Sequence, residues 1–149
     1  MKFRSSFRVA APKAVVSAFH QDPKVLGRLT PFPIVLRYKH VQPIEEGSVF
    51  KFTIWLTIVP VPWVARHRGI AFPDGFVDEQ IQGPFKQWVH HHRFVEIDEG
   101  HTEVVDEIEA SYRPHLLWGP VGVFMWLTLP LLFAYRAWKT RRLLQATER

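Results

Sequence analysis

Apolar and polar side chains alternate along much of this chain, which is the pattern of a β-strand with one buried face. Seven segments show this alternation: 3–9, 34–42, 50–58, 63–70, 76–81, 85–97 and 102–112. Ala11-Pro12 and Asp22-Pro23 favour two short helices between the first and second of these segments, because proline suits the first turn of a helix. The order of one strand, two helices, six strands and a final helix predicts an α+β fold built on an antiparallel sheet.

The final segment, Leu116–Leu144, is apolar at almost every helical angle, and no charged residue occurs from Leu116 to Tyr135. A helix that is apolar all round must be covered on most sides, either by a curved sheet or by lipid. About twenty uncharged residues just reach the length that crosses a bilayer, and basic residues follow from Arg136 onward. Pro130 is expected to kink or divide the helix. We therefore expect a sheet wrapped around this helix, with membrane contact as the alternative.

The prolines at positions 60 and 62 predict the turn between the third and fourth strands. Pairing about that turn would place Ile58 near Trp63. Every second residue from Phe50 to Ile58 would then lie on one apolar inner face.

In the last three strands, the face that carries Trp and Phe also carries four ionisable side chains. The predicted turns place Asp78 opposite His90 and His92 opposite Asp106. Buried polar groups must be hydrogen-bonded, so each Asp–His neighbour pair would satisfy itself. Ionisable groups on an inner wall indicate a cavity or water at that place and not a dry core.

Three interpretations of these four side chains stay open. The pairs could be structural and lock the register of the strands. A His beside a carboxylate can also act as a general acid or base, which makes His90, His92, Asp78 and Asp106 candidate catalytic residues. Zinc binding is chemically possible for the same groups, but alternating His residues also arise for packing reasons, and we expect no metal. His67 is either a satisfied core residue or a ligand contact.

Composition narrows the class of protein. A chain of 149 residues is expected to form one domain, residues 1–149, and its 47% apolar and 14% aromatic content argues against disorder. The net charge of +5 comes largely from the two ends, with no basic stripe between them, so nucleic-acid binding is not expected. The absence of cysteine excludes disulfides and thiolate metal sites. The first residues contain no apolar signal segment, so a cytoplasmic location is expected.

Several motifs, in order over nearly the whole chain, resemble the START-like SRPBCC superfamily, in particular its small bacterial members described as polyketide cyclase/dehydrase-like or ligand-binding. The residues that carry the resemblance are Val16, Phe19-His20, Asp22, Leu29-Thr30-Pro31, Gly47, Trp63, Phe76-Val77-Asp78-Glu79-Gln80, Gly83-Pro84-Phe85, Trp88, His90, His92-Arg93-Phe94, Thr102, Asp106 and Tyr135-Arg136. The resemblance implies a helix-grip fold, in which a curved antiparallel sheet of six to seven strands surrounds a long C-terminal helix and leaves a cavity. The superfamily holds carriers, hormone and alkaloid binders, aromatic cyclases and interaction modules, so the fold alone does not choose a function.

These observations favour a protein that binds a hydrophobic small molecule (a lipid, quinone, polyketide or similar compound) without catalysis and without a cofactor. The expected ligand-binding residues are Phe52, Ile54, Leu56, Trp63, His67, Phe76, Asp78, Gln80, Trp88, His90, His92, Phe94, Asp106, Ile108, Leu127, Leu131 and Tyr135. One alternative is a cyclase or dehydratase that uses an inner His/Asp pair. Another is a module that contacts the membrane surface or forms a homodimer through its C-terminal helix.

Overall fold

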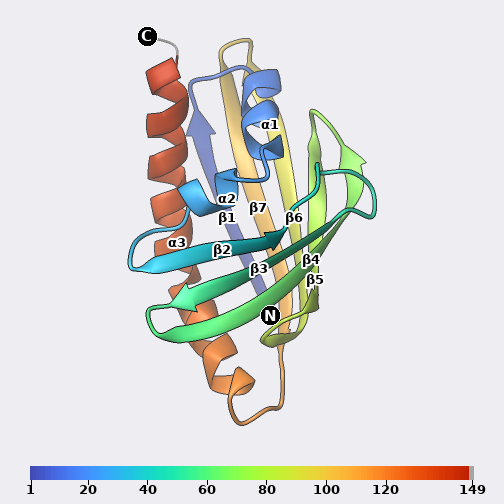
Figure 1. Ribbon diagram of the computed structural model, residues 1–149. Coiled ribbons are helices and arrows are strands. Elements are labelled where there is room, and N and C mark those ends of the chain that lie inside the picture. The colour runs from blue at the N-terminus through green and yellow to red at the C-terminus, as the bar shows by residue number, and fades with distance from the viewer. Residues whose placement is uncertain (148–149) are drawn as a thin grey trace.

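The computed structural model describes residues 1–147, with side chains up to Gln145. Over this range the elements are β1 (Lys2–Val9), α1 (Lys13–Gln21), α2 (Val25–Arg28), β2 (Ile34–His40), β3 (Val49–Leu56), β4 (Val59–Ala71), β5 (Gly75–Gln82), β6 (Phe85–Asp98), β7 (His101–Tyr112) and α3 (Trp118–Thr147) (Figure 1). The α+β class, the number and order of the strands and the two short helices after β1 are therefore as the sequence predicted.

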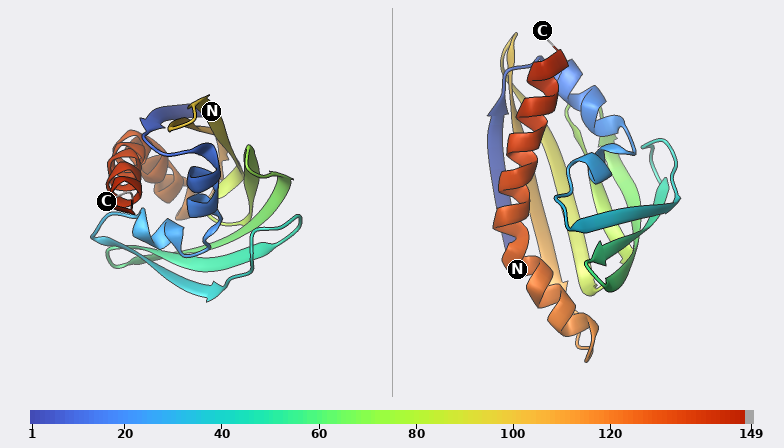
Figure 2. Two further views of the ribbon diagram at one scale, coloured as in Figure 1. Left: turned by 90° about the horizontal axis from the view of Figure 1, so that it is seen from above. Right: turned by 60° about the vertical axis from the view of Figure 1, so that its left-hand side comes forward.

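The strands form one antiparallel sheet in the order β1-β7-β6-β5-β4-β3-β2. From β2 to β6, each strand pairs with the next one in sequence. The last strand, β7, also pairs with β1, so β1 and β2 are the two edges. The sheet curves strongly, and α3 lies inside the curve between these edges, next to β1 (Figure 2). The two short helices lie across one end of the curved sheet (Figure 2).

The outer face of the sheet is charged and paired across strands. Arg66 and Arg68 of β4 bind the two carboxylate oxygens of Glu79 on β5, at 2.6 and 3.1 Å. Arg93 of β6 binds Glu107 of β7 in the same way. These side chains lie in or close to solvent, so they contribute little to stability individually. Their alternation with apolar residues nevertheless fixes which face of each strand points inward.

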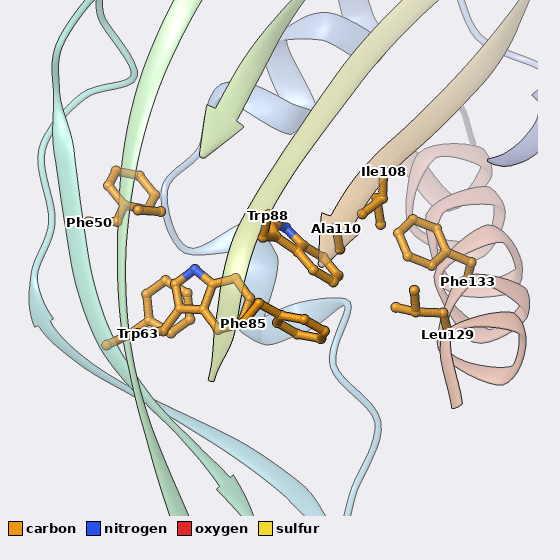
Figure 3. Close-up of a cluster of buried hydrophobic side chains, with 10 residues drawn as sticks. Phe50, Trp63, Phe85, Trp88, Ile108, Ala110, Leu129 and Phe133 are labelled. Atoms are coloured by element: carbon orange, nitrogen blue, oxygen red, sulfur yellow. The ribbon is translucent and has the colours of Figure 1, made fainter. Parts of the chain in front are cut away.

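The main hydrophobic core lies between the concave face of the sheet and α3 (Figure 3). Trp63 of β4 and Trp88 of β6 meet edge to face, with ring centres 5.4 Å apart, and Leu129 and Phe133 of α3 lie beside Ile108 of β7. A second buried cluster joins the C-terminal part of α3 to β1, α1 and the middle of the sheet; its residues are Phe7, Val9, Ala11, Val16, Phe76, Phe94, Val104 and Leu144. Protein therefore covers one side of α3.

The turn between β3 and β4 lies earlier than the prolines predicted. Ile58 is in the turn and 86% exposed, whereas Pro60 and Pro62 lie inside β4, paired with β3. The predicted neighbour of Trp63 was therefore wrong, because Trp63 pairs with Phe52. Prolines are tolerated here because β5 pairs only with the later part of β4, so the missing N–H groups remove no hydrogen bond to a second neighbour.

Pro130 does not divide the C-terminal helix, because α3 is continuous from Trp118 to Thr147. The helix is bent, and its first turns run at an angle to the rest (Figure 2). Pro130 is on the exposed side of α3. A proline inside a helix removes one backbone hydrogen bond and bends the helix, and the packed Leu129 and Phe133 hold the helix on both sides of this position.

Close packing at the start of β5 generates a first prediction. Gly75 has a φ of +156°, and a Cβ atom placed there would lie 2.0 Å from the backbone carbonyl oxygen of His92 on β6. We expect Gly75→Ala to lower the free energy of unfolding by about 2–4 kcal/mol and the Tm by roughly 5–10 °C in thermal unfolding. Gly100→Ala, in the exposed β6–β7 turn, is the control, because its Cβ would have only a 3.8 Å contact with Asp98. Equal Tm values for the two variants would contradict the close approach.

Candidate functional site

A cavity of about 530 Å³ lies between the concave face of the sheet, the two short helices and α3. Its wall is mainly apolar and aromatic, with side chains from α2, β2, β3, β4, β6 and α3. The polar side chains gather where the middle of the sheet meets α1 and the second half of α3. The cavity therefore has an apolar part and one polar end.

Most of the residues predicted from the sequence line this cavity. They are Phe52, Ile54, Leu56, Trp63, His67, Phe76, Asp78, Trp88, His90, His92, Asp106, Leu131 and Tyr135. Strand alternation was enough to predict which strand residues point into the cavity, because a curved sheet directs one face of each strand toward the helix. Their role as ligand contacts stays a prediction.

Four predicted residues lie outside the cavity wall. The side-chain amide of Gln80 is bound to the backbone N–H and carbonyl of Phe85, so it holds the β5–β6 turn. Phe94 and Ile108 have the predicted inward direction but are packed within the hydrophobic clusters. Leu127 is 71% exposed, because it lies on the opposite side of α3 from the sheet.

The four ionisable side chains of the inner face form one hydrogen-bonded cluster, and the predicted strand pairs are confirmed. His90 Nε2 lies 2.8 Å from Asp106 Oδ1, and His92 Nε2 lies 2.5 Å from Asp78 Oδ2. The second nitrogen of each imidazole faces the other carboxylate, at 3.6 Å for His90 and 3.3 Å for His92. Each carboxylate is thus flanked by both imidazoles, and the ring of Phe76 stacks on His92 at 4.2 Å.

Both carboxylates of the cluster are ionised. Burial alone would raise the pKa of Asp78, but His90 and His92 outweigh burial and lower it to about 2. Burial also opposes ionisation of Asp106, but hydrogen bonds from His90 and His92 hold its pKa well below the ordinary range. Burial disfavours a charged His92, but its bonds to Asp106 and Asp78 raise its pKa to about 9. His92 is therefore an imidazolium at neutral pH and donates from both ring nitrogens.

The other imidazoles on the cavity wall are neutral at neutral pH. Burial, together with the positive charge of His92, lowers the pKa of His90. Burial also lowers the pKa of His20 to about 4, and its Nδ1–H donates to the carbonyl of Val16 at 2.8 Å. His67 is 4% exposed, with its pKa lowered by burial and its Nδ1 3.2 Å from the Ser48 hydroxyl.

Arg136 is a cavity residue that the sequence reasoning assigned to a basic flank of the helix. It lies three residues after Phe133 and four before Thr140, so it belongs to the stripe of α3 that faces the sheet. Burial lowers its pKa, whereas the charges of Asp106 and Asp78 oppose that shift. Its spacing of three residues from Phe133 and four from Thr140 is the signal that could have placed it on the inner side of the helix. That signal could not be used, because apolar residues occur on every side of this helix and do not mark the inner one.

The cavity reaches the surface at Leu131 of α3, which lines it and is exposed, and this opening is called the mouth. Phe32 is 89%, Leu131 76% and Leu127 71% exposed, and the loop that holds Phe32 runs beside α3 in both views of Figure 2. Within the described residues, one helical segment, Trp118–Gln145, is long and apolar enough to cross a membrane, and only 17% of its most apolar window is buried. Sheet packing therefore covers this helix on one side and leaves the other exposed.

The cluster has the spacing of a metal site but is satisfied without an ion. Ligand atoms of Asp78, His90 and His92 lie within 4.8 Å of one another. The imidazole nitrogens are already committed to carboxylates, and Arg136 supplies further positive charge on the opposite wall. A divalent cation would have to displace the His92 proton and face that guanidinium, so the donor set does not favour one.

Comparison with known proteins adds a likeness of fold. No family model matches the sequence, and no curated protein matches it. An aromatase/cyclase structure from Streptomyces sp. R1128 is similar with a TM-score of 0.79 and 15% identity, over 100% of this chain and 96% of that one. A START superfamily protein from Mycobacterium smegmatis is similar with a TM-score of 0.71 and 13% identity, over 95% of this chain and 98% of that one.

A nucleoside-diphosphate sugar epimerase from Corynebacterium glutamicum shares more of the sequence, 26%, with a TM-score of 0.68. The match covers 96% of this chain but only 29% of that protein, so the likeness concerns one part of a longer chain. Together these structures show that the present chain has the START-like helix-grip fold that the sequence resemblance implied.

The raised pKa of His92 predicts a decline in stability at alkaline pH. A group whose pKa rises on folding stabilises the folded state fully below its unfolded pKa and loses this contribution as pH rises through the folded pKa. For His92 that window runs from 6.5 to about 9, and the free energy of unfolding should fall across it by about 3 kcal/mol. Below 6.5 the lowered pKa values of His20, His67 and His90 reduce stability instead, so the maximum is expected near pH 6.5.

Chemical denaturation at a series of pH values measures this effect. His92→Gln should remove most of the alkaline decline, because no imidazolium remains to lose its proton. His91→Gln is the matched control, since the neighbouring side chain points to the opposite face of β6 and contacts none of the cluster. An alkaline decline that persists unchanged in His92→Gln would show that the cluster does not hold that proton.

Proposed function

We propose that this protein binds an apolar small molecule, a lipid, quinone, polyketide or similar compound, in the cavity between the sheet and α3, and releases it unchanged. The observation that carries the proposal is the cavity itself, about 530 Å³ with a mainly apolar wall and a few polar groups at one end. Ligand sites in proteins have this size and this distribution of polar groups. The apolar body of the ligand would lie among Trp63, Leu36, Leu56 and Met125, and its polar end would face the Asp–His cluster.

The state of the cluster favours orientation of a ligand over catalysis. A general base needs a free lone pair and a pKa near neutrality. His92 has both nitrogens bound to carboxylates and keeps its proton up to about pH 9, and His20 has a pKa of about 4, which makes it a weak base. Neither imidazole is therefore suited to proton transfer at neutral pH.

An enzyme of cyclase or dehydratase type is the second candidate, because one similar structure is that of an aromatase/cyclase. In this alternative His90 would act as the acid or base, with Asp106 as its partner 2.8 Å away. Mass analysis with chromatography of the compounds recovered from wild type and from His90→Gln, produced in the same cells, separates the two. A carrier holds the same compound in both proteins, whereas an enzyme holds unreacted substrate in the variant.

Two neighbouring residues of the edge strand β2 provide a test of the binding site. Leu36 lines the cavity, whereas Val35 faces outward and is 47% exposed. We expect Leu36→Arg to weaken binding of the neutral apolar dye Nile red at least tenfold, because the arginine places a charge and extra volume in the apolar part of the wall. Val35→Arg should bind the dye like wild type. Fluorescence titration measures both, and equal affinity of all three proteins would refute a ligand site at this place.

The apolar mouth of the cavity supports a second proposal, that the protein exchanges its ligand while resting on the cytoplasmic surface of a membrane. Leu131 lines the cavity and is exposed on the apolar face of α3, so a ligand could pass from lipid into the cavity without crossing water. From Trp118 to Thr147, α3 has no acidic residue, whereas Lys139, Arg141 and Arg142 follow its apolar part. This order suits an apolar stripe in the bilayer surface and basic groups among anionic lipids.

Vesicle flotation tests this contact. The double variant with Phe32→Asp and Leu127→Asp should lose more than tenfold of its partitioning into vesicles of equal parts phosphatidylcholine and phosphatidylglycerol, because each exposed side chain would otherwise be buried in lipid. The matched control carries Val95→Asp and Ile97→Asp, two exposed apolar positions on β6. A wild-type protein that stays with the solvent and forms a dimer in solution would show that the exposed face of α3 serves a second copy instead.

A further inference from the structure

Arg136 has a hydrogen-bonding atom that no group of the protein satisfies. Its Nε is buried and, among the described side chains, is the single buried nitrogen or oxygen atom without a hydrogen-bond partner. The guanidinium carbon lies 5.0 Å from the centre of the Phe133 ring, and the side chain lines the cavity. A buried donor without an acceptor costs free energy, and native proteins rarely leave one unless something else occupies the site.

Each carboxylate whose charge acts on Arg136 binds the imidazoles through one oxygen, Oδ2 of Asp78 and Oδ1 of Asp106. Asp106 accepts from His90 Nε2 and His92 Nδ1, and Asp78 accepts from His92 Nε2. Both carboxylates act on Arg136 through their charge, but neither receives a hydrogen bond from it. Within the described residues the Arg136 guanidinium lines the cavity without a hydrogen bond to the protein, so its partner would come from the contents of the cavity. That partner must be an acceptor, because Arg can only donate.

Charge decides which kind of acceptor fits. At neutral pH the polar end holds two carboxylates, Asp78 and Asp106, matched by the His92 imidazolium and the Arg136 guanidinium. His90 and His20 are neutral. An ionised ligand head would add a charge that no residue compensates, and a buried unpaired charge is strongly disfavoured.

We infer that the ligand presents an uncharged oxygen acceptor, such as a ketone, ester or quinone carbonyl, to the cavity-lining guanidinium of Arg136, and that ionised carboxylates and phosphates are poor ligands. The inference rests on the proposed function, since it names the chemical class of the molecule that the cavity holds. The carbonyl lies at the polar end, and the apolar body extends toward the mouth along Leu36 and Leu56.

Three naphthalene probes substituted at the same ring position test the inference on the wild-type protein. Acetylnaphthalene carries the ketone, ethylnaphthalene has nearly the same shape without the oxygen, and naphthoate carries an ionised carboxylate. In Nile red displacement we expect acetylnaphthalene to bind about tenfold more tightly than ethylnaphthalene, as for one hydrogen bond from a charged donor. Naphthoate should bind no more tightly than ethylnaphthalene.

Variants of α3 assign the preference to one residue. Arg136→Met should remove the tenfold advantage of acetylnaphthalene and leave the affinity for ethylnaphthalene within about twofold. The same variant leaves two carboxylates against one imidazolium, so the cation naphthylmethylamine should bind it at least about tenfold more tightly than it binds wild type. Arg142→Met, on the exposed side of the same helix, should keep the wild-type order of the probes. Circular dichroism confirms that each variant is folded.

The outcomes separate this inference from the proposed function. If ethylnaphthalene and Nile red bind but the ketone has no advantage, the cavity is an apolar site and the assignment to Arg136 is overturned. If naphthoate binds most tightly and depends on Arg136, the ligand is an anion and the inference is overturned. If neither the dye nor any probe binds, both the inference and the proposed function are wrong.

Discussion

Two carboxylates on the inner face of a sheet, one on each side of β6, must be balanced by cations, and the polar end of this molecule is built around that requirement. The strand register brings His90 and His92 between Asp78 and Asp106, and α3 adds Arg136 from the opposite wall. Loss of a carboxylate or of a cation from this group would leave an uncompensated charge away from water, which is far more costly than loss of an exposed ion pair. The balance thus ties three strands and the helix to one arrangement.

The remainder of the cavity follows from how a curved sheet holds a single helix. The apolar helix α3 packs against β1 and the middle of the sheet through one stripe that contains Leu129 and Phe133, and it leaves a gap to the opposite edge strand, β2. Large aromatic side chains such as Trp63 and Trp88 pack against each other along the sheet instead of filling that gap. The result is an apolar space with a charged end, where the Arg136 guanidinium has no hydrogen-bond partner in the protein, beside an exposed apolar helix face.

The fold and the charged cluster could be predicted from the sequence because strand alternation and short polar turns set the register of the last three strands. The turn at Ile58 could not, since the pair Pro60 and Pro62 is compatible both with a turn and with a strand that lacks one neighbour. The sequence also could not show which side of α3 faces the sheet and which side is exposed. A helix that is apolar all round has no periodic signal, so Leu127 was assigned to the cavity and Arg136 to a basic flank of the helix. Leu127 is instead exposed, and Arg136 lines the cavity.

The most direct test of this account is a crystal structure of the protein as purified from the producing cells, with no compound added. We expect density for a non-protein molecule between the sheet and α3, with an uncharged oxygen within hydrogen-bond distance of the Arg136 guanidinium and an apolar body directed toward the mouth. A cavity closed by collapsed side chains, or Arg136 bound directly to Asp78 or Asp106 with nothing between them, would contradict it.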